Sequence, residues 1–172
     1  MSFEIDLTNF NDDGFVTIPV GRYNVEANPK NWLYYVKQET GNPVILMGTT
    51  ILDGEFKGEG LAYFATITDH SRSKANYLGA LKAFGLLREG DRAQDGTLRT
   101  SLQFGEKDAK GKHPITAVVI NGQARPIAGK AIAVVVPRDG DPTETSVKTF
   151  EAMPKSGSAL GHTKIAEDDV PF

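Results

Sequence analysis

Glycine, proline and asparagine divide this sequence into short segments that are rich in β-branched and aromatic residues. Segments of this kind at short spacing favour an antiparallel meander, the usual start of a small barrel or sandwich. Residues 28–31 and 41–43 combine proline with asparagine or glycine, which predicts turns. The predicted strands cover residues 22–27, 32–39, 44–52, 61–68, 115–121, 130–137 and 145–150.

One helix is predicted between the early and the late strands. Leu78, Leu81 and Phe84 recur at helical spacing, and Gly85 or Gly90 can end the helix. Strands, one helix and then further strands is the order of an OB-fold, whose helix plugs the barrel between its third and fourth strands. We therefore expect a mainly β protein with a five-stranded Greek-key OB barrel and one helix between strands 3 and 4.

The 172 residues suggest one domain with tails. We expect an N-terminal arm over residues 1–17, the OB-fold domain over 18–150 and a flexible acidic tail over 151–172. Residues 88–112 are polar and rich in glycine, with a possible hairpin at 98–104. This stretch predicts an arm inserted into the barrel at about 88–128.

Charge is distributed unevenly along the chain, although the net charge is only −3. Residues 70–138 hold 12 Lys/Arg against 5 Asp/Glu, whereas residues 1–13 carry four acids and no base. A basic middle between acidic ends is typical of a body that binds a phosphate backbone and carries acidic arms. Ordinary scatter of charge is the alternative.

Several classes of protein are disfavoured by the sequence. The chain has no cysteine, so it has no disulfide framework and no thiolate metal site. No apolar run approaches membrane-spanning length, and the acidic N-terminus does not resemble a signal peptide. His70, His113 and His162 are scattered, and no Gly-rich run ends in Lys-Ser or Lys-Thr. We expect no catalysis, no metal and no cofactor.

Aromatic residues on the predicted strands are candidates for base stacking, which single-strand binders combine with a basic groove. Alternation places Phe64 on the outer face of its strand, and Tyr35 beside Lys37 on another. By the same alternation Trp32 and Tyr34 face inward, but Trp32 sits at a strand end, where alternation is a weak guide. All four rings are therefore candidate DNA-binding residues, with core packing as the alternative for each.

Cations near these strands are candidates for phosphate contacts. Arg72 and Lys74 lie at the expected helix start, and Arg99 lies in the arm. Lys107, Lys110 and Lys112 form a glycine-flanked basic loop that is able to close over a phosphate backbone. A solvated surface loop is the alternative interpretation.

The last six residues combine an acidic run with a proline and a final phenylalanine: Glu167, Asp168, Asp169, Val170, Pro171 and Phe172. We expect an extended tip that places a ring in an apolar pocket and a carboxylate on a basic rim. The tip resembles that of bacterial single-stranded DNA-binding proteins. That resemblance implies that residues 168–172 recruit replication and repair proteins. As an alternative role for the tip, we expect it to compete with DNA for the basic groove and to occupy the groove when DNA is absent.

A second resemblance covers roughly residues 1–70, where Asp6–Phe10, Gly21–Glu26, Thr40–Asn42 and Ile51–Gly58 look like a family of small phage and prophage proteins. It implies sequence-independent binding of single-stranded DNA during replication, recombination or repair, possible self-association on the DNA, and a place in the cytoplasm of a phage-infected bacterial host. The competing hypothesis is a β-barrel adaptor, such as a virion or inhibitor module. Such a module would act through the acidic tip and never bind DNA.

Overall fold

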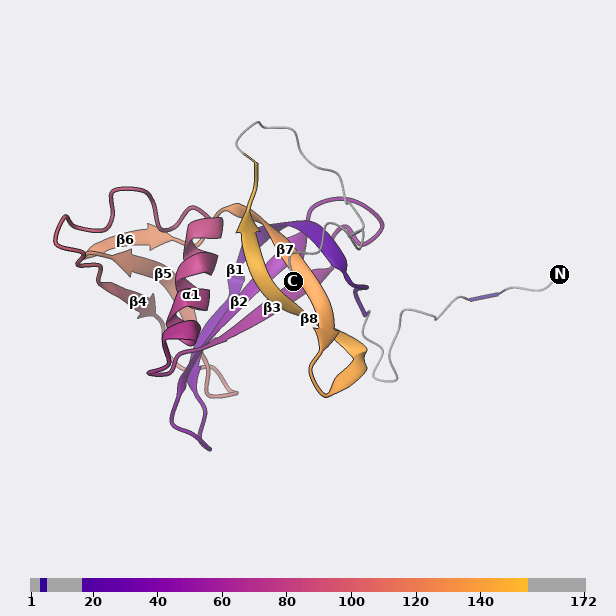
Figure 1. Ribbon diagram of the computed structural model, residues 1–172. Helices are drawn as coiled ribbons and strands as arrows, with labels where there is room; N and C mark the ends of the chain where they lie inside the picture. The colour runs from indigo at the N-terminus through magenta and orange to yellow at the C-terminus, as the bar shows by residue number, and fades with distance from the viewer. Residues whose placement is uncertain (1–3, 6–16, 155–172) are drawn as a thin grey trace.

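The computed structural model of the chain describes residues 4–5 and 17–154 and is built from antiparallel strands with one helix in that part (Figure 1). The predicted N-terminal arm and tail lie mostly outside the described residues. No helix in the described part is long and apolar enough to cross a membrane. The elements are β1 (Gly21–Val36), β2 (Pro43–Ile51), β3 (Gly60–Thr66), α1 (Ser71–Ala83), β4 (Thr100–Phe104), β5 (His113–Ile120), β6 (Gln123–Pro126), β7 (Lys130–Arg138) and β8 (Asp141–Ala152).

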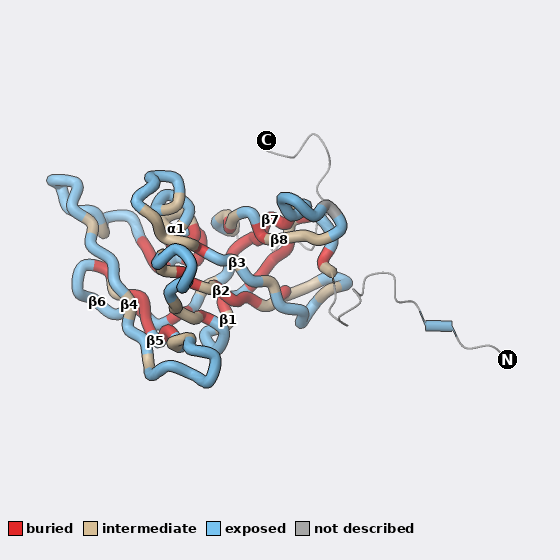
Figure 2. The backbone as a smooth tube through the Cα atoms, turned by 90° about the horizontal axis from the view of Figure 1, so that it is seen from below, coloured by how far each residue is buried: buried red, intermediate tan, exposed pale blue. Residues whose placement is uncertain are grey.

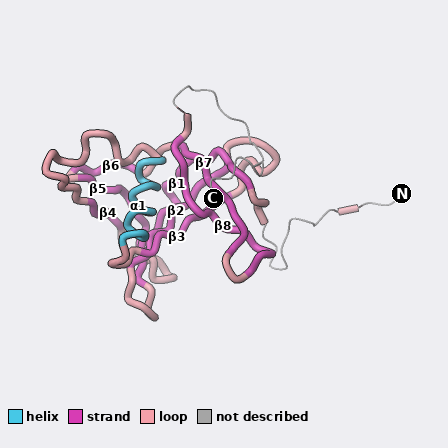
Figure 3. Tube along the Cα trace, in the orientation of Figure 1, coloured by secondary structure: helices cyan, strands magenta, loops and turns pink. Residues whose placement is uncertain are grey.

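β1 is the strand that connects the whole sheet. It pairs with β2 along its length, while its other edge pairs first with β7 and then, through Leu33 and Tyr34, with β5. β3 continues the sheet beyond β2, and β8 continues it beyond β7. β4 and β6 pair with the two edges of β5, and these three strands lie within the stretch 88–128 where an arm was expected (Figure 3). We call the three strands and the loops between them the arm.

The prediction of two strands at 22–27 and 32–39 with a turn between them is wrong. β1 runs through this stretch, and its register with β2 shifts between Ala27 and Trp32. Pro29 is tolerated there because a proline in a strand is accommodated at an irregularity of the ladder. The bulged backbone crosses β2 at Gly48, where an added Cβ would lie 2.7 Å from the Asn31 carbonyl oxygen.

The prediction of a five-stranded closed barrel also needs correction. Eight strands are present in the described residues, and no hydrogen-bonded ladder joins β3 to β8, so the sheet stays open. The Tyr63 and Phe150 rings nevertheless meet edge to face across this seam, with centroids 5.8 Å apart. The expected hairpin within 98–104 is absent, since β4 pairs with β5 instead.

The core lies between the sheet and the C-terminal end of α1. Figure 2 shows the buried stretches along the strands and beside the helix, with exposed loops around them. Trp32 is fully buried there, and its indole Nε1 donates a hydrogen bond of 3.0 Å to the Gly48 carbonyl. Phe84, the residue that caps α1, packs edge to face on both Trp32 and Phe150. This packing fixes α1 on one face of the sheet, and the opposite face carries the exposed Phe64.

Candidate nucleic-acid interface

Strand register places the predicted stacking residues Phe64 and Tyr35 on one face of the sheet. Leu33 is opposite Leu46, and Leu46 is opposite Phe64, so these side chains form a row across β1, β2 and β3. Directly opposed residues point to the same side of a sheet, and so do residues two apart in a strand. Tyr35 therefore shares the face of Phe64, whose exposed fraction is 57%. The predicted outward orientation of Phe64 is confirmed by its exposure, whereas Tyr35 lies on the same face but is half-buried.

The opposite face of the same strands belongs to the core. Trp32, Met47 and Tyr63 form the adjacent row, in which Trp32 and Met47 are fully buried. The inclusion of Trp32 among the base-stacking candidates is thus a wrong prediction, because its ring has no exposed surface. Alternation alone had already favoured the buried position.

A groove of about 890 Å³ forms where the end of β1 meets the loop between β4 and β5. We call it the basic groove. Its charged lining residues are four lysines and one glutamate, Glu39, so the lining carries a net charge of +3. The predicted candidates that meet in it are Tyr34, Tyr35, Lys37, Lys107, Lys110 and Lys112.

Lys112 connects the basic groove to the exposed face of the sheet. Leu33 pairs with Pro114, so continuing this antiparallel register brings Tyr35 opposite Lys112. The Lys112 Nζ indeed lies 4.9 Å from the centre of the Tyr35 ring. Such cation–π contacts contribute about 0.5–1 kcal/mol at exposed sites. The cation of Lys112 therefore lies over the face of the Tyr35 ring, and both residues line the basic groove.

The basic loop owes its shape to Asp108. The carboxylate Oδ1 accepts hydrogen bonds of 2.9 Å from the backbone amides of both Lys110 and Lys112. These bonds, that of Lys112 first, hold the pKa of the Asp108 carboxyl below its ordinary value. The Asp108 carboxylate is hydrogen-bonded to backbone amides and so fixes the turn from which the side chains of Lys107, Lys110 and Lys112 extend.

Two further rings border the basic groove and were not among the predicted site residues. Phe104 is 47% exposed and stacks on Tyr34 with centroids 5.0 Å apart. His113 lies 4.8 Å from Phe104, and its Nδ1 is 2.8 Å from the Gly105 carbonyl oxygen. Alternation did not indicate the exposure of Phe104, because the register of β4 with β5 shifts between Gln103 and Phe104.

The remaining predicted cations lie elsewhere. Arg72 and Lys74 are exposed on α1, which packs against the core face and not against the face of Phe64. Arg99 precedes β4, and its backbone amide donates to the Asn121 Oδ1 at the end of the arm away from the basic loop. The structure does not bring these three residues into the basic groove.

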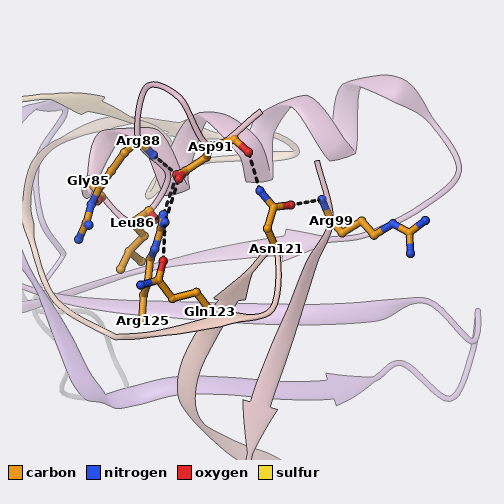
Figure 4. A network of polar contacts seen from close by, with 8 residues as sticks. All are labelled: Gly85, Leu86, Arg88, Asp91, Arg99, Asn121, Gln123 and Arg125. Carbon is orange, nitrogen blue, oxygen red and sulfur yellow. Dashed lines mark hydrogen bonds and ion pairs between the residues drawn. The ribbon is translucent and has the colours of Figure 1, made fainter. Parts of the chain in front are cut away.

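An ion pair that was not predicted from the sequence joins the arm to the segment that follows α1 (Figure 4). The Arg125 guanidinium donates to both Asp91 carboxylate oxygens, at 2.6 and 2.8 Å, and to the Leu86 carbonyl at 2.7 Å. The Asp91 backbone carbonyl also accepts from the Asn121 amide. β6 is thereby tied to the segment that follows α1. Hydrogen bonds from Arg125 first, and then from the Arg88 amide, hold the pKa of the Asp91 carboxyl well below its ordinary range.

Replacing Arg125 with methionine is expected to lower the melting temperature by several degrees, because the Asp91 carboxylate, 13% exposed, loses its partner. A carboxyl with a depressed pKa contributes stability above its unfolded pKa of about 3.9, and the contribution is lost as the pH falls towards the folded value. The difference from the unsubstituted protein should therefore be complete at pH 5–7 and narrow below about pH 4. Thermal unfolding followed by circular dichroism measures both effects.

Arg99→Met, at an exposed arginine of the same arm, is the control. An equal melting temperature for the two variants would contradict a fastening role.

No protein-family model matches this chain, and no curated protein matches it. Within residues 4–5 and 17–154, no group of three histidine, aspartate or glutamate side chains is placed to hold a metal ion. The geometry of the basic groove and of the exposed sheet face is therefore the basis for a functional assignment.

Proposed function

We propose that this chain is a non-catalytic protein that binds single-stranded DNA largely without regard to sequence. The observation that carries the proposal is the position of Tyr35, which shares one sheet face with the exposed Phe64 and lies under Lys112 at the edge of the basic groove. Rings that accept any base, beside cations that neutralise phosphates, are the arrangement used by sequence-tolerant single-strand binders.

The sheet face that carries Phe64 and Tyr35 also defines the path that we propose for the DNA. The row Pro114, Leu33, Leu46 and Phe64 crosses four adjacent strands, β5, β1, β2 and β3. With strands about 4.8 Å apart, this row spans roughly 14 Å. A strand of DNA lying across it would stack on Phe64 at one end. At the other end it would reach Tyr35, Lys37 and the basic loop.

We further propose that β1, β2, β3, β7 and β8 are an OB-type barrel with an open seam. Their order, β3-β2-β1-β7-β8, is that of an OB-fold whose third and fifth strands do not pair. α1 follows β3, as the helix of an OB-fold does, and the arm is inserted after it. The proposed DNA face includes β2 and β3, which are the strands that OB-folds use for oligonucleotides.

Residues 168–172 would recruit replication, recombination or repair proteins to the bound DNA. Their carboxylates increase the rate of encounter with a basic partner, and Val170 and Phe172 supply apolar contacts. The alternative function, a protein adaptor that never binds DNA, is favoured by one observation, an apolar cleft beside α1 that could hold a peptide.

Titrating the full chain with oligo-dT, the matching duplex and oligo-U at two salt concentrations separates these functions. Binding of oligo-dT that is much tighter than binding of the duplex, and that weakens as salt rises, is the expected result. An absence of oligo-dT binding at low salt would reject the proposal and leave the adaptor. Equal binding of the duplex would show that the cations act alone, without the rings.

A further inference from the structure

An apolar cleft separates α1 from the arm on the side of the molecule that faces away from Phe64. Its volume is about 820 Å³, and it is lined on one wall by the helix and on the other by β4 and the segment before it. A smaller hollow of about 400 Å³ continues it, since Arg92 and Leu98 line both. We call the two together the α1–arm cleft. Its main apolar residues are Tyr77, Leu78, Leu81, Leu98, Leu102 and Phe104.

Cations border this apolar floor. Lys74 and Lys82 are each four residues from Leu78 on α1, so one turn of helix separates the apolar residue from a lysine on either side. Arg88 and Arg92 face them from the segment after the helix, and Glu89 is the one acid among the lining residues. Asp91 is already bound to Arg125. A fitting ligand has bulky apolar side chains next to several carboxylates.

The chain itself contains a segment of that chemistry at residues 167–172. Three consecutive acids, Glu167, Asp168 and Asp169, precede Val170 and Phe172. The acids match the lysines and arginines at the rim, and the two apolar side chains match the floor.

We propose that residues 167–172 dock in the α1–arm cleft of the same chain. The described chain leaves the body at Pro154, four residues after Phe150, whose ring packs on Phe84 at the end of α1. The chain thus leaves the body near the C-terminal end of α1, and Lys82, which borders the cleft, lies in the last turn of that helix. Residues 155–166 are twelve residues, which span up to roughly 40 Å when extended. That length exceeds what is needed on a domain with a radius of gyration of about 14 Å.

This docking is separate from the proposed DNA contacts. The α1–arm cleft shares Tyr34 with the basic groove, but none of its cations lines that groove. The segment would be stored on the core side of the sheet, away from Phe64 and Tyr35. A partner protein would then have to displace the segment from the cleft, whereas DNA would bind without displacing it.

Disulfide trapping tests the docking without any DNA, so its failure is distinguishable from failure of the proposed function. The chain has no cysteine, and Ser101 lines the cleft and is exposed. Under mild oxidation the full-length Ser101→Cys/Ala166→Cys variant is expected to form an internal disulfide at least 10-fold faster than Ala128→Cys/Ala166→Cys. Ala128 is a matched control because it is exposed, lies outside the cleft, and precedes Gly129, which abuts Phe84 near the exit of the tail.

Two sets of substitutions in the trapping variant identify the contacts. Lys74→Glu/Arg92→Glu reverses two exposed cations of the rim, and Val170→Ser/Phe172→Ser removes the apolar side chains. Each set is expected to reduce the rate of disulfide formation to that of the control pair. High salt is expected to have the same effect. Equal rates for the two cysteine pairs would overturn the proposal. So would a product consisting of disulfide-linked dimers, because docking would then occur between chains.

Discussion

Replacing Lys107, Lys110 and Lys112 with alanine is expected to weaken the binding of single-stranded DNA about 100-fold at about 0.1 M salt. Each neutralised phosphate contributes about 0.7 to the slope of log affinity against log salt for single strands, so three lysines account for a change of about 2 in that slope. We expect this loss of affinity because the three lysines of the basic loop line the same groove as Lys37.

The measurement is a fluorescence titration of labelled oligo-dT over a series of salt concentrations. The triple variant Lys57→Ala/Lys82→Ala/Lys130→Ala is the control, because it removes the same charge from exposed positions outside the basic groove. It should keep a slope close to that of the unsubstituted protein. An unchanged affinity and slope in the loop variant would remove the loop from the DNA path. Equal losses in both triple variants would show that net charge acts without a defined site.

Replacing Tyr35 and Phe64 with alanine is expected to weaken binding by at least about 30-fold while leaving the salt slope unchanged. A base stacked on an aromatic ring is worth about 1–3 kcal/mol, and tenfold in affinity corresponds to about 1.4 kcal/mol. The two rings lie on different strands with Leu33 and Leu46 between them, so their effects should add. Loss of affinity at constant slope separates stacking from phosphate neutralisation.

Single substitutions at Phe64 refine this test. Phe64→Tyr keeps a ring and should bind as well as the unsubstituted protein, whereas Phe64→Leu keeps apolar surface and should lose most of the contribution. Because Phe64 is 57% exposed, neither change should alter the melting temperature much. Equal binding by the leucine and tyrosine variants would mean that the face contributes apolar contact only. Full binding by the Tyr35→Ala/Phe64→Ala variant would place the DNA elsewhere.

Local patterning predicted the strands and the exposed face well. The alternation of 61–67 identified Phe64 as exposed and Ala65 as buried, since a two-residue period follows directly from strand geometry. The same rule applied to 32–37 placed Tyr35 and Lys37 together and Trp32 inside. The prediction for Trp32 was wrong because its position at a predicted strand end was given more weight than alternation.

Features that depend on distant parts of the chain were not predictable. Pro29 and the asparagines around it indicate a turn locally, but pairing with β2 on one edge and with β7 and β5 on the other continues the strand. Arg125 and Asp91 are 34 residues apart, and nothing near either one indicates the partner. The position of α1 on the core face, which removes Arg72 and Lys74 from the basic groove, follows from the packing of Phe84 on Trp32 and Phe150.

The hydrogen bonds that Asp108 accepts have a consequence for the energetics of any ligand that meets the basic loop. A glycine-flanked loop without such a carboxylate would lose backbone conformational entropy when it settled on a phosphate chain. Here the amides of Lys110 and Lys112 are held in advance, so association restricts mainly the aliphatic stems of the lysines. The backbone of the turn is therefore held rigid, while the charged ends of the lysine side chains can adjust their positions. This combination suits a surface that must accept many different strands.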